Sequence, residues 1–135
     1  LVLGWTSVQN NIDIIPIIFY FGAIFWTLAY DTIYGFQDIK DDEIIGLKST
    51  SIKFKSKPNV FLFICYTIFL TSLILIGILN HMSNIYFLFL VLVFLHLFLQ
   101  LKKLDINDPM KCLEVFKSNN LLGVIIFISL IIGKF

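Results

Sequence analysis

The stretch "IIPIIFYFGAIFWTLAYDTIYGFQ", residues 14–37, decides the fold class of this chain. A helix that crosses the hydrocarbon core of a bilayer needs about 20 mostly apolar residues. The stretch meets that length, and Asp31 is its one charged residue. Pro16 falls in what would be the first helical turn, where proline is tolerated. The stretch therefore predicts a transmembrane helix.

Three more apolar segments predict spans at about 60–79, 85–101 and 118–133, the last with a possible amphipathic start near Glu114. Hydrophobic residues make up 59% of the 135-residue chain and charged residues 14%, with a mean hydropathy of +0.93. Soluble domains average about 45–50% apolar and about 25% charged residues. We therefore expect an all-α polytopic transmembrane helical bundle with four complete spans, forming at most one domain over residues 1–135.

The lysines predict the topology. Nine of the ten lie in residues 38–57 and 102–117, whereas the loop "NHMSN", residues 80–84, has no Lys, Asp or Glu. The positive-inside rule places the two lysine-rich loops in the cytoplasm and leaves Lys134 on the other face. We expect a multi-pass protein of a bacterial inner membrane, in contact with the lipid bilayer and with no nucleic acid.

Other sequence features exclude several classes. The chain opens "LVLGWTSV", without an initiator Met or a basic leader, so we expect no signal peptide. We expect residues 1–12 to be the tail of a preceding helix and its loop. Cys65 and Cys112 are far apart and form no metal or redox motif. The sequence has no P-loop, GxGxxG or GxSxG signature of a soluble enzyme.

Acidic residues crowd the end of the first predicted span, in "YDTIYGFQDIKDDEIIGLKST", residues 30–50. If the helix continues through Asp42, the carboxylates of Asp31, Asp38 and Asp42 fall within roughly 40° of one another. Tyr34 joins that face, and Asp41 points away from it. Three aligned carboxylates repel one another and are costly near a membrane, so a bound cation would explain their register.

Magnesium fits this arrangement, because Mg²⁺ is usually held by one or two carboxylates together with waters and substrate phosphates. We expect Asp38 and Asp42 to be the metal pair. The deeper Asp31 is a candidate hydrogen-bond or proton acceptor. Lys48, followed by Ser49 and a threonine, suits phosphate oxygens. Together these residues suggest a diphosphate held at the membrane surface, with apolar helices behind it holding a lipid tail.

Competing interpretations stay open at this point. A mixed-charge run after a span is commonly a solvated loop. A transport subunit would spread ionisable groups along a path through the membrane, and an assembly protein would not need three acids in register. Asn119, expected at the start of the last span, either caps that helix or contacts the substrates. Trp26 is expected to be lipid-facing or cavity-lining bulk.

The stretch "YDTIYGFQDIKDDEIIGLKSTSI", residues 30–52, resembles the second aspartate-rich motif of the UbiA superfamily of intramembrane prenyltransferases. The form Y-D-T-x-Y-x-x-x-D-x-x-D-D-x-x-x-G-x-K-S-T is most similar to the 4-hydroxybenzoate branch, which serves ubiquinone biosynthesis. Two weaker similarities lie in "LGWTSV", residues 3–8, and in "FKSNNLLGVIIFISL", residues 116–130. The runner-up interpretations are the menaquinone and haem O branches, which lack the GxKST form after their aspartates.

The resemblance implies a nine-helix membrane fold around a central cavity, with transfer of a polyprenyl group from polyprenyl diphosphate to 4-hydroxybenzoate. It implies Mg²⁺ on Asp38 and Asp42. Asp31 and Tyr34 match the family's deeper pair, implied to be catalytic, near the aromatic acceptor. Lys48 and Asn119 match positions implied to bind the substrates.

The chain departs from the family pattern in one respect. The first motif, of the form N-D-x-x-D-x-x-x-D, is absent from the sequence. We therefore expect the chain to be the C-terminal part of a longer prenyltransferase and to be inactive alone.

Overall fold

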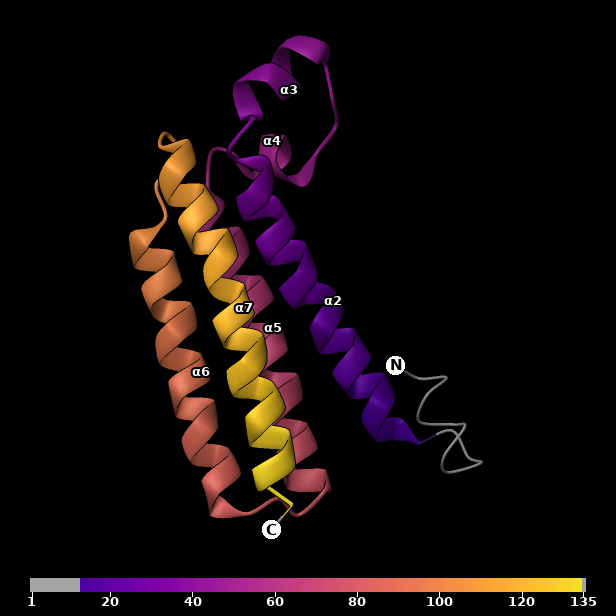
Figure 1. Ribbon diagram of the computed structural model, residues 1–135. Helices are drawn as coiled ribbons and strands as arrows, with labels where there is room; N and C mark the ends of the chain where they lie inside the picture. Colours follow the sequence, from indigo (N-terminus) through magenta and orange to yellow (C-terminus); the bar gives the residue numbers. More distant parts are fainter. Residues whose placement is uncertain (1–12, 135) are drawn as a thin grey trace.

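The structure, a computed structural model, describes residues 13–134, and within that range it is helical with no strand (Figure 1). Four of the helices are long and apolar enough to cross a membrane, namely α2, α5, α6 and α7. This confirms the predicted all-α multi-pass bundle. The helices are α2 (Ile14–Gly35), α3 (Ile39–Ile45), α4 (Thr50–Phe54), α5 (Pro58–Leu79), α6 (Asn84–Lys103) and α7 (Pro109–Ile132).

The predicted spans are in the right places, and the bounds differ for local reasons. The start predicted for the last helix is too late, because α7 begins at Pro109. Asp108 caps it: one carboxylate oxygen accepts the backbone N–H groups of Met110 and Lys111 at 3.0 and 3.3 Å. A capping aspartate followed by proline at the first helical position is a strong start signal. The first span ends at Gly35, two residues before the predicted end.

The two ends of the bundle differ in character. Figure 1 shows α3, α4 and the α6–α7 loop at one end, and the α5–α6 turn beside the end of α7 at the other. At the second end, Ser83 N–H donates to Gly133 C=O at 2.9 Å. The two lysine-rich loops therefore lie at the same end, as predicted from the charge pattern. The cytoplasmic assignment of that end stays a prediction.

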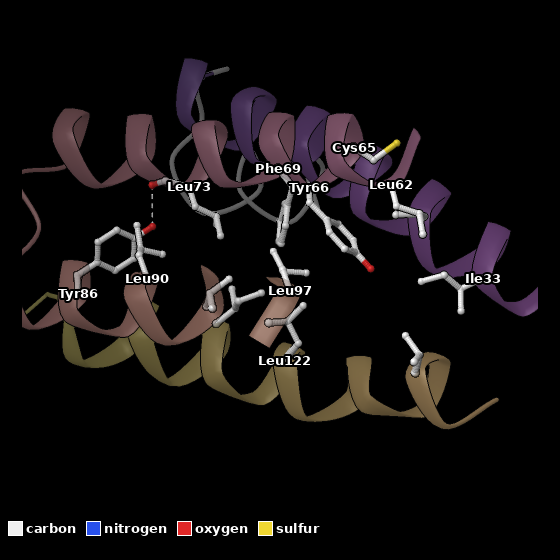
Figure 2. Packing of buried hydrophobic residues seen from close by; sticks show 14 of the residues in the cluster. Ile33, Leu62, Cys65, Tyr66, Phe69, Leu73, Tyr86, Leu90, Leu97 and Leu122 are labelled. Atoms are coloured by element: carbon white, nitrogen blue, oxygen red, sulfur yellow. Dashed lines mark hydrogen bonds between the residues drawn. The ribbon is translucent and has the colours of Figure 1, made fainter. Parts of the chain in front are cut away.

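The core lies between α2, α5, α6 and α7 and is made of large apolar side chains (Figure 2). Leu73 of α5, Leu97 of α6 and Leu122 of α7 are among its fully buried members. Tyr86 is buried as well, and its hydroxyl donates to Leu73 C=O at 2.8 Å, the bond drawn as a dashed line in Figure 2. Outward apolar side chains are exposed along all four long helices, as lipid-facing surfaces require.

Polar and small residues hold the helices close together. The Tyr66 hydroxyl of α5 donates to Gln100 Oε1 of α6, and Gln100 Nε2 donates to Ser118 Oγ of α7, both at 2.7 Å. Gly22 of α2 lies against the Ser72 side chain of α5, so a Cβ at that glycine would clash with the Ser72 hydroxyl. Interhelical hydrogen bonds and small contact residues are the usual means of joining helices in lipid.

Candidate functional site

The helix that carries Asp31 does not continue to Asp42. The prediction of one continuous helix through the acidic cluster is wrong, because α2 ends at Gly35 and α3 begins at Ile39. Two short-range bonds close α2: Phe36 N–H donates to Ile33 C=O at 3.2 Å, and Gln37 N–H donates to Tyr34 C=O at 3.0 Å. The stripe that joins all three aspartates is therefore lost.

Packing explains the break. Phe36 and Ile39 are buried in a small second cluster with Cys112 of α7, separate from the main core. Phe36 follows the last residue of α2 and Ile39 opens α3, so the chain bends to bury both side chains in this cluster. Gly35 also lies against Ser51 of α4, where a Cβ would clash with the serine hydroxyl. The periodicity of the charged residues carries no information about these contacts.

Asp38 and Asp42 keep their register after the break. Asp42 N–H donates to Asp38 C=O at 3.0 Å, so the two residues are one helical turn apart at the start of α3. Asp38 occupies the N-cap position, yet its side chain makes no capping bond. Asp38 is exposed and Asp42 is half-buried. Their carboxylates are thus available to a ligand at one end of the apolar bundle.

Most of the other acids are already engaged. Glu43, Glu114 and Asp105 pair with lysines, at 2.8, 2.7 and 3.1 Å respectively. Asp13 and Asp108 cap α2 and α7. Within residues 13–134 the acids with neither a lysine partner nor a capping bond are Asp31, Asp38, Asp41 and Asp42.

The donor set fits a partial metal site. Residues 13–134 contain no group of three or more His, Cys, Asp or Glu side chains that could enclose a metal ion. What α3 offers is two carboxylates one turn apart, with no lysine neutralising them. Mg²⁺ suits such a pair, because the ion keeps several waters and takes substrate phosphate oxygens as further ligands.

Asp31 and Tyr34 lie on the last turns of α2, three residues apart and both exposed. They therefore share a face of that helix. The Tyr34 ring rests against Phe116 of α7 with the ring centroids 5.0 Å apart, and 49% of the residue remains exposed. The structure thus keeps this predicted pair on one exposed face of α2, near the end of the helix.

Lys48 is exposed in the link between α3 and α4 and lines a shallow open depression with Ser49, Thr50 and Lys53. The two hydroxyls expected to assist it are used in the fold. Ser49 Oγ accepts Ile52 N–H at 3.3 Å and caps α4, while Thr50 and Thr32 share a hydroxyl–hydroxyl bond of 2.7 Å. Within residues 13–134 neither Lys48 nor Lys53 is paired with an acid, so both ammonium groups beside the depression are left for an anion.

Asn119 lies in the interior of α7, so the expected position at a helix start is wrong. It is buried, and its side-chain amide bonds within the protein: Oδ1 accepts the indole N–H of Trp26 at 2.9 Å. Trp26 is therefore more than bulk, a role that sequence reasoning missed. A tryptophan within an apolar span needs a partner for its N–H, and that requirement was the available signal.

Gln100 was also missed. Its side chain joins Tyr66 of α5 to Ser118 of α7 inside the bundle. The signal was present in the sequence, since a glutamine within an apolar span needs hydrogen-bond partners from neighbouring helices.

Comparisons with known proteins bear on this arrangement. Residues 1–131 match the UbiA prenyltransferase family. Proteins named "4-hydroxybenzoate polyprenyltransferase, mitochondrial" are similar to the chain, with 41% identity in Bos taurus and 37% in Homo sapiens, in each case over 98% of this chain and 36% of the relative. The Dictyostelium discoideum protein of that name is 38% identical over 85% of this chain and 25% of its own length. No solved structure matches the chain.

The chain spans about a third of the length of the Bos taurus and Homo sapiens relatives. Both relatives are named as mitochondrial proteins, so they give no support to a bacterial inner membrane. The expected similarity at residues 3–8 and the helix tail and loop expected over residues 1–12 lie outside the described part of the structure, although the family match includes these residues. Because that match runs over residues 1–131, the chain belongs to the UbiA prenyltransferase family.

Proposed function

We propose that this chain supplies the part carrying the second aspartate-rich motif of an enzyme that transfers a polyprenyl group from polyprenyl diphosphate to 4-hydroxybenzoate, the ring prenylation of ubiquinone biosynthesis. The observation that carries the proposal is the pair of uncommitted carboxylates, Asp38 and Asp42, at one end of an apolar bundle. The names of the relatives support the choice of reaction and acceptor.

The metal ligands in this proposal are Asp38 and Asp42. Mg²⁺ supplies positive charge beside the departing diphosphate when it is bound there. Lys48 adds a second positive charge from the link that follows α3, where its ammonium is exposed and borders an open depression. Preorganised charge directed at a developing anion is commonly the largest single contribution to catalysis.

Asp31 and Tyr34 are the proposed catalytic residues. The Asp31 carboxylate would accept a hydrogen bond from the phenol of the acceptor, or the proton that leaves the attacked ring carbon. The exposed part of the Tyr34 ring would face the allylic carbon as it becomes positive, a contact that contributes roughly 0.5–2 kcal/mol. The surrounding apolar helices would keep water away from that carbon.

The same observations give less support to another acceptor or to a transport role. The menaquinone and haem O branches share the aspartates, but the relatives compared above carry 4-hydroxybenzoate in their names. A transport subunit would place ionisable groups along the depth of the membrane. Here the uncommitted acids gather at one end. The names of the relatives also favour a mitochondrial membrane over the bacterial inner membrane expected from the sequence.

A radiolabelled transfer assay tests the proposal. Membranes containing the protein expressed from its complete reading frame are supplied with labelled polyprenyl diphosphate, Mg²⁺ and one acceptor at a time: 4-hydroxybenzoate, the menaquinone-branch acceptor or haem. We expect label on 4-hydroxybenzoate, and loss of that signal when a chelator removes the metal. Label on another acceptor, or none on any acceptor, would contradict the proposal.

The 135-residue chain alone, purified in lipid nanodiscs, is assayed in parallel. We expect no transfer, because the first aspartate-rich motif is absent from its sequence and residues 13–134 contain no group of three or more side chains that could enclose a metal ion. Turnover by the isolated chain would show that this motif is not required.

A further inference from the structure

A hydrogen bond joins α2 to α7 in the middle of the apolar bundle. Trp26 Nε1–H donates to Asn119 Oδ1 at 2.9 Å, and Asn119 is only 7% exposed. A buried indole N–H without an acceptor is costly in an apolar environment, so this bond favours one orientation of the Trp26 ring.

The asparagine is itself held in one orientation. Its Nδ2 group donates to the backbone carbonyls of Val115 and Phe116, at 3.2 and 3.1 Å, one turn earlier in α7. Both donor hydrogens are therefore used, and Oδ1 is the atom left to face Trp26. An amide with both donors bonded inside its own helix is poorly placed to donate to a substrate.

Trp26 is one member of a continuous aromatic row between α2 and α7. Its ring stacks on Phe69 of α5, with centroids 5.2 Å apart and planes at 10°, and meets Tyr30 edge-on at 5.7 Å. Tyr30 and Tyr34 both contact the ring of Phe116, at 6.0 and 5.0 Å. We call the rings of Trp26, Tyr30, Phe116 and Tyr34 the aromatic row.

We propose that Asn119 is a positioning residue: by fixing the Trp26 indole, it sets the aromatic row and thereby the place of the Tyr34 ring. The inference rests on the proposed function, because Tyr34 is the ring assigned there to the allylic carbon. Asn119 is bonded to two members of the row, Trp26 at one end and the backbone of Phe116 next to the other end. Its Oδ1 accepts the indole N–H of Trp26, and its Nδ2 bonds the carbonyl of Phe116, whose ring carries Tyr34.

The position of Tyr34 affects the fate of the reacting carbon. One part of its ring rests on Phe116 and the other is open, so the row decides where the open part lies. If the ring shifts, water reaches the allylic carbon: the C–O bond to diphosphate breaks, a water oxygen bonds the carbon, and a proton is released. The products are then free prenyl alcohol and diphosphate instead of prenylated acceptor.

The first test needs no activity. The chain is labelled with 3-fluorotyrosine in nanodiscs, and the ¹⁹F signal of Tyr34 is assigned with Tyr34→Phe. Asn119→Ala and Trp26→Phe should both move the Tyr34 signal, since the first removes the acceptor and the second the donor while keeping a ring. Asn120→Ala, at the exposed neighbouring position, should not move it. An unmoved Tyr34 signal in folded Asn119→Ala or Trp26→Phe would overturn the proposal.

The second test uses the protein from its complete reading frame. We expect Asn119→Ala and Trp26→Phe to lower kcat by about tenfold, to change the KM for polyprenyl diphosphate less than twofold, and to raise the share of prenyl alcohol among the products. The double variant should be no worse than the worse single variant, because both act through one bond. If the variants only lower the amount of folded protein and leave the product ratio unchanged, Asn119 has a structural role only and the proposal is overturned. Absence of wild-type transfer together with a shifted Tyr34 signal would instead reject the proposed function.

Discussion

The polar side chains inside the bundle and the acidic side chains at the α3 end differ in whether they have bonding partners within the protein. Inside the bundle, Gln100 has partners on both α5 and α7, and Asn119 joins α7 to α2. At the α3 end, Asp38 and Asp42 have neither a capping bond nor a lysine partner. The comparison separates polar residues that hold the fold from polar residues that remain available to a ligand.

The difference follows from the surrounding medium. In lipid a polar group without a partner costs several kcal/mol, which favours the bonds that Gln100 and Asn119 make inside the bundle. The exception in the described part of the spans is His96 of α6, whose Nε2 is buried without a partner. At the membrane surface water satisfies a carboxylate, and an acid stays uncommitted at little cost. Pairing is nevertheless possible there, since Glu43 in the same short helix bonds Lys55 at 2.8 Å. The acids left without partners at this end are therefore the better candidates for function.

The largest effect should come from removing those carboxylates. Asp38→Ala or Asp42→Ala in the protein from its complete reading frame should lower Mg²⁺-dependent transfer by about a thousandfold, because each loses a proposed metal ligand and several kcal/mol of charge stabilisation. The measurement is the radiolabelled transfer assay at saturating substrate, with protein amount normalised by blotting.

Asp41→Ala is the matched control for that pair. Asp41 also lacks a partner, but it directly precedes Asp42 and so points about 100° away from that carboxylate around the helix, which prevents the two from sharing one ion; its loss should change activity only a few-fold. Equal losses at Asp38, Asp41 and Asp42 would show that general negative charge matters and not the one-turn register. Wild-type activity in both ligand variants would remove the metal assignment.

The same comparison shows what sequence can predict. Four apolar stretches predicted four spans, because the length needed to cross lipid leaves few alternatives. The local pairs also survived: Asp38 with Asp42, and Asp31 with Tyr34, are close in sequence and lie within one helix or at its cap. The branch of the family was predicted from the GxKST form, which is a local pattern as well.

Contacts between distant segments were not predictable in this way. The break after Gly35 depends on Phe36 and Ile39 packing against Cys112, far along the chain. The hydrogen bond to Asn119 Oδ1 comes from the indole of Trp26, 93 positions away in sequence. Helical periodicity describes one helix at a time. It therefore aligned Asp31 with Asp38 and Asp42 across the break after Gly35, which tertiary packing creates.

The second prediction concerns the hydrogen bonds that Gln100 makes inside the bundle. Gln100→Leu leaves the Tyr66 hydroxyl without its acceptor and removes a donor to Ser118, so the free energy of unfolding should fall by about 1–3 kcal/mol. Unfolding by a denaturing detergent, followed by circular dichroism, gives the value.

The matched variant for this network is Tyr66→Phe combined with Gln100→Leu. Removing both partners leaves no unsatisfied hydroxyl at that bond, so the double variant should be less destabilised than the sum of the two single variants. Additive losses would mean that the two side chains stabilise the bundle independently, against the network described here.

A smaller effect is expected where α3 is attached. Ile39→Ala trims one of three buried members of the second cluster, and the free energy of unfolding should fall by about 1 kcal/mol, below the usual cost in a large core. The change should be local: amide hydrogen exchange should accelerate in α3 and stay unchanged in α5. Acceleration in both helices alike would show that the α3 end and the bundle open as one unit.

The smallest effect concerns an acid that is already engaged. The backbone N–H of Asn107 and then the Lys111 ammonium, each 3.1 Å from the Asp105 carboxylate, hold its pKa below the ordinary value. A lowered folded-state pKa gives a stability contribution that is present above the unfolded pKa, about 3.9, and is lost as the pH falls through the folded value. Because Asp105 lies in a solvent-accessible loop, water screens this contribution to a small one. An NMR titration of the carboxyl group should give a midpoint below the ordinary value, and Lys111→Ala should raise it. A midpoint at or above the ordinary value would contradict the bonds that Asn107 and Lys111 make to the Asp105 carboxylate.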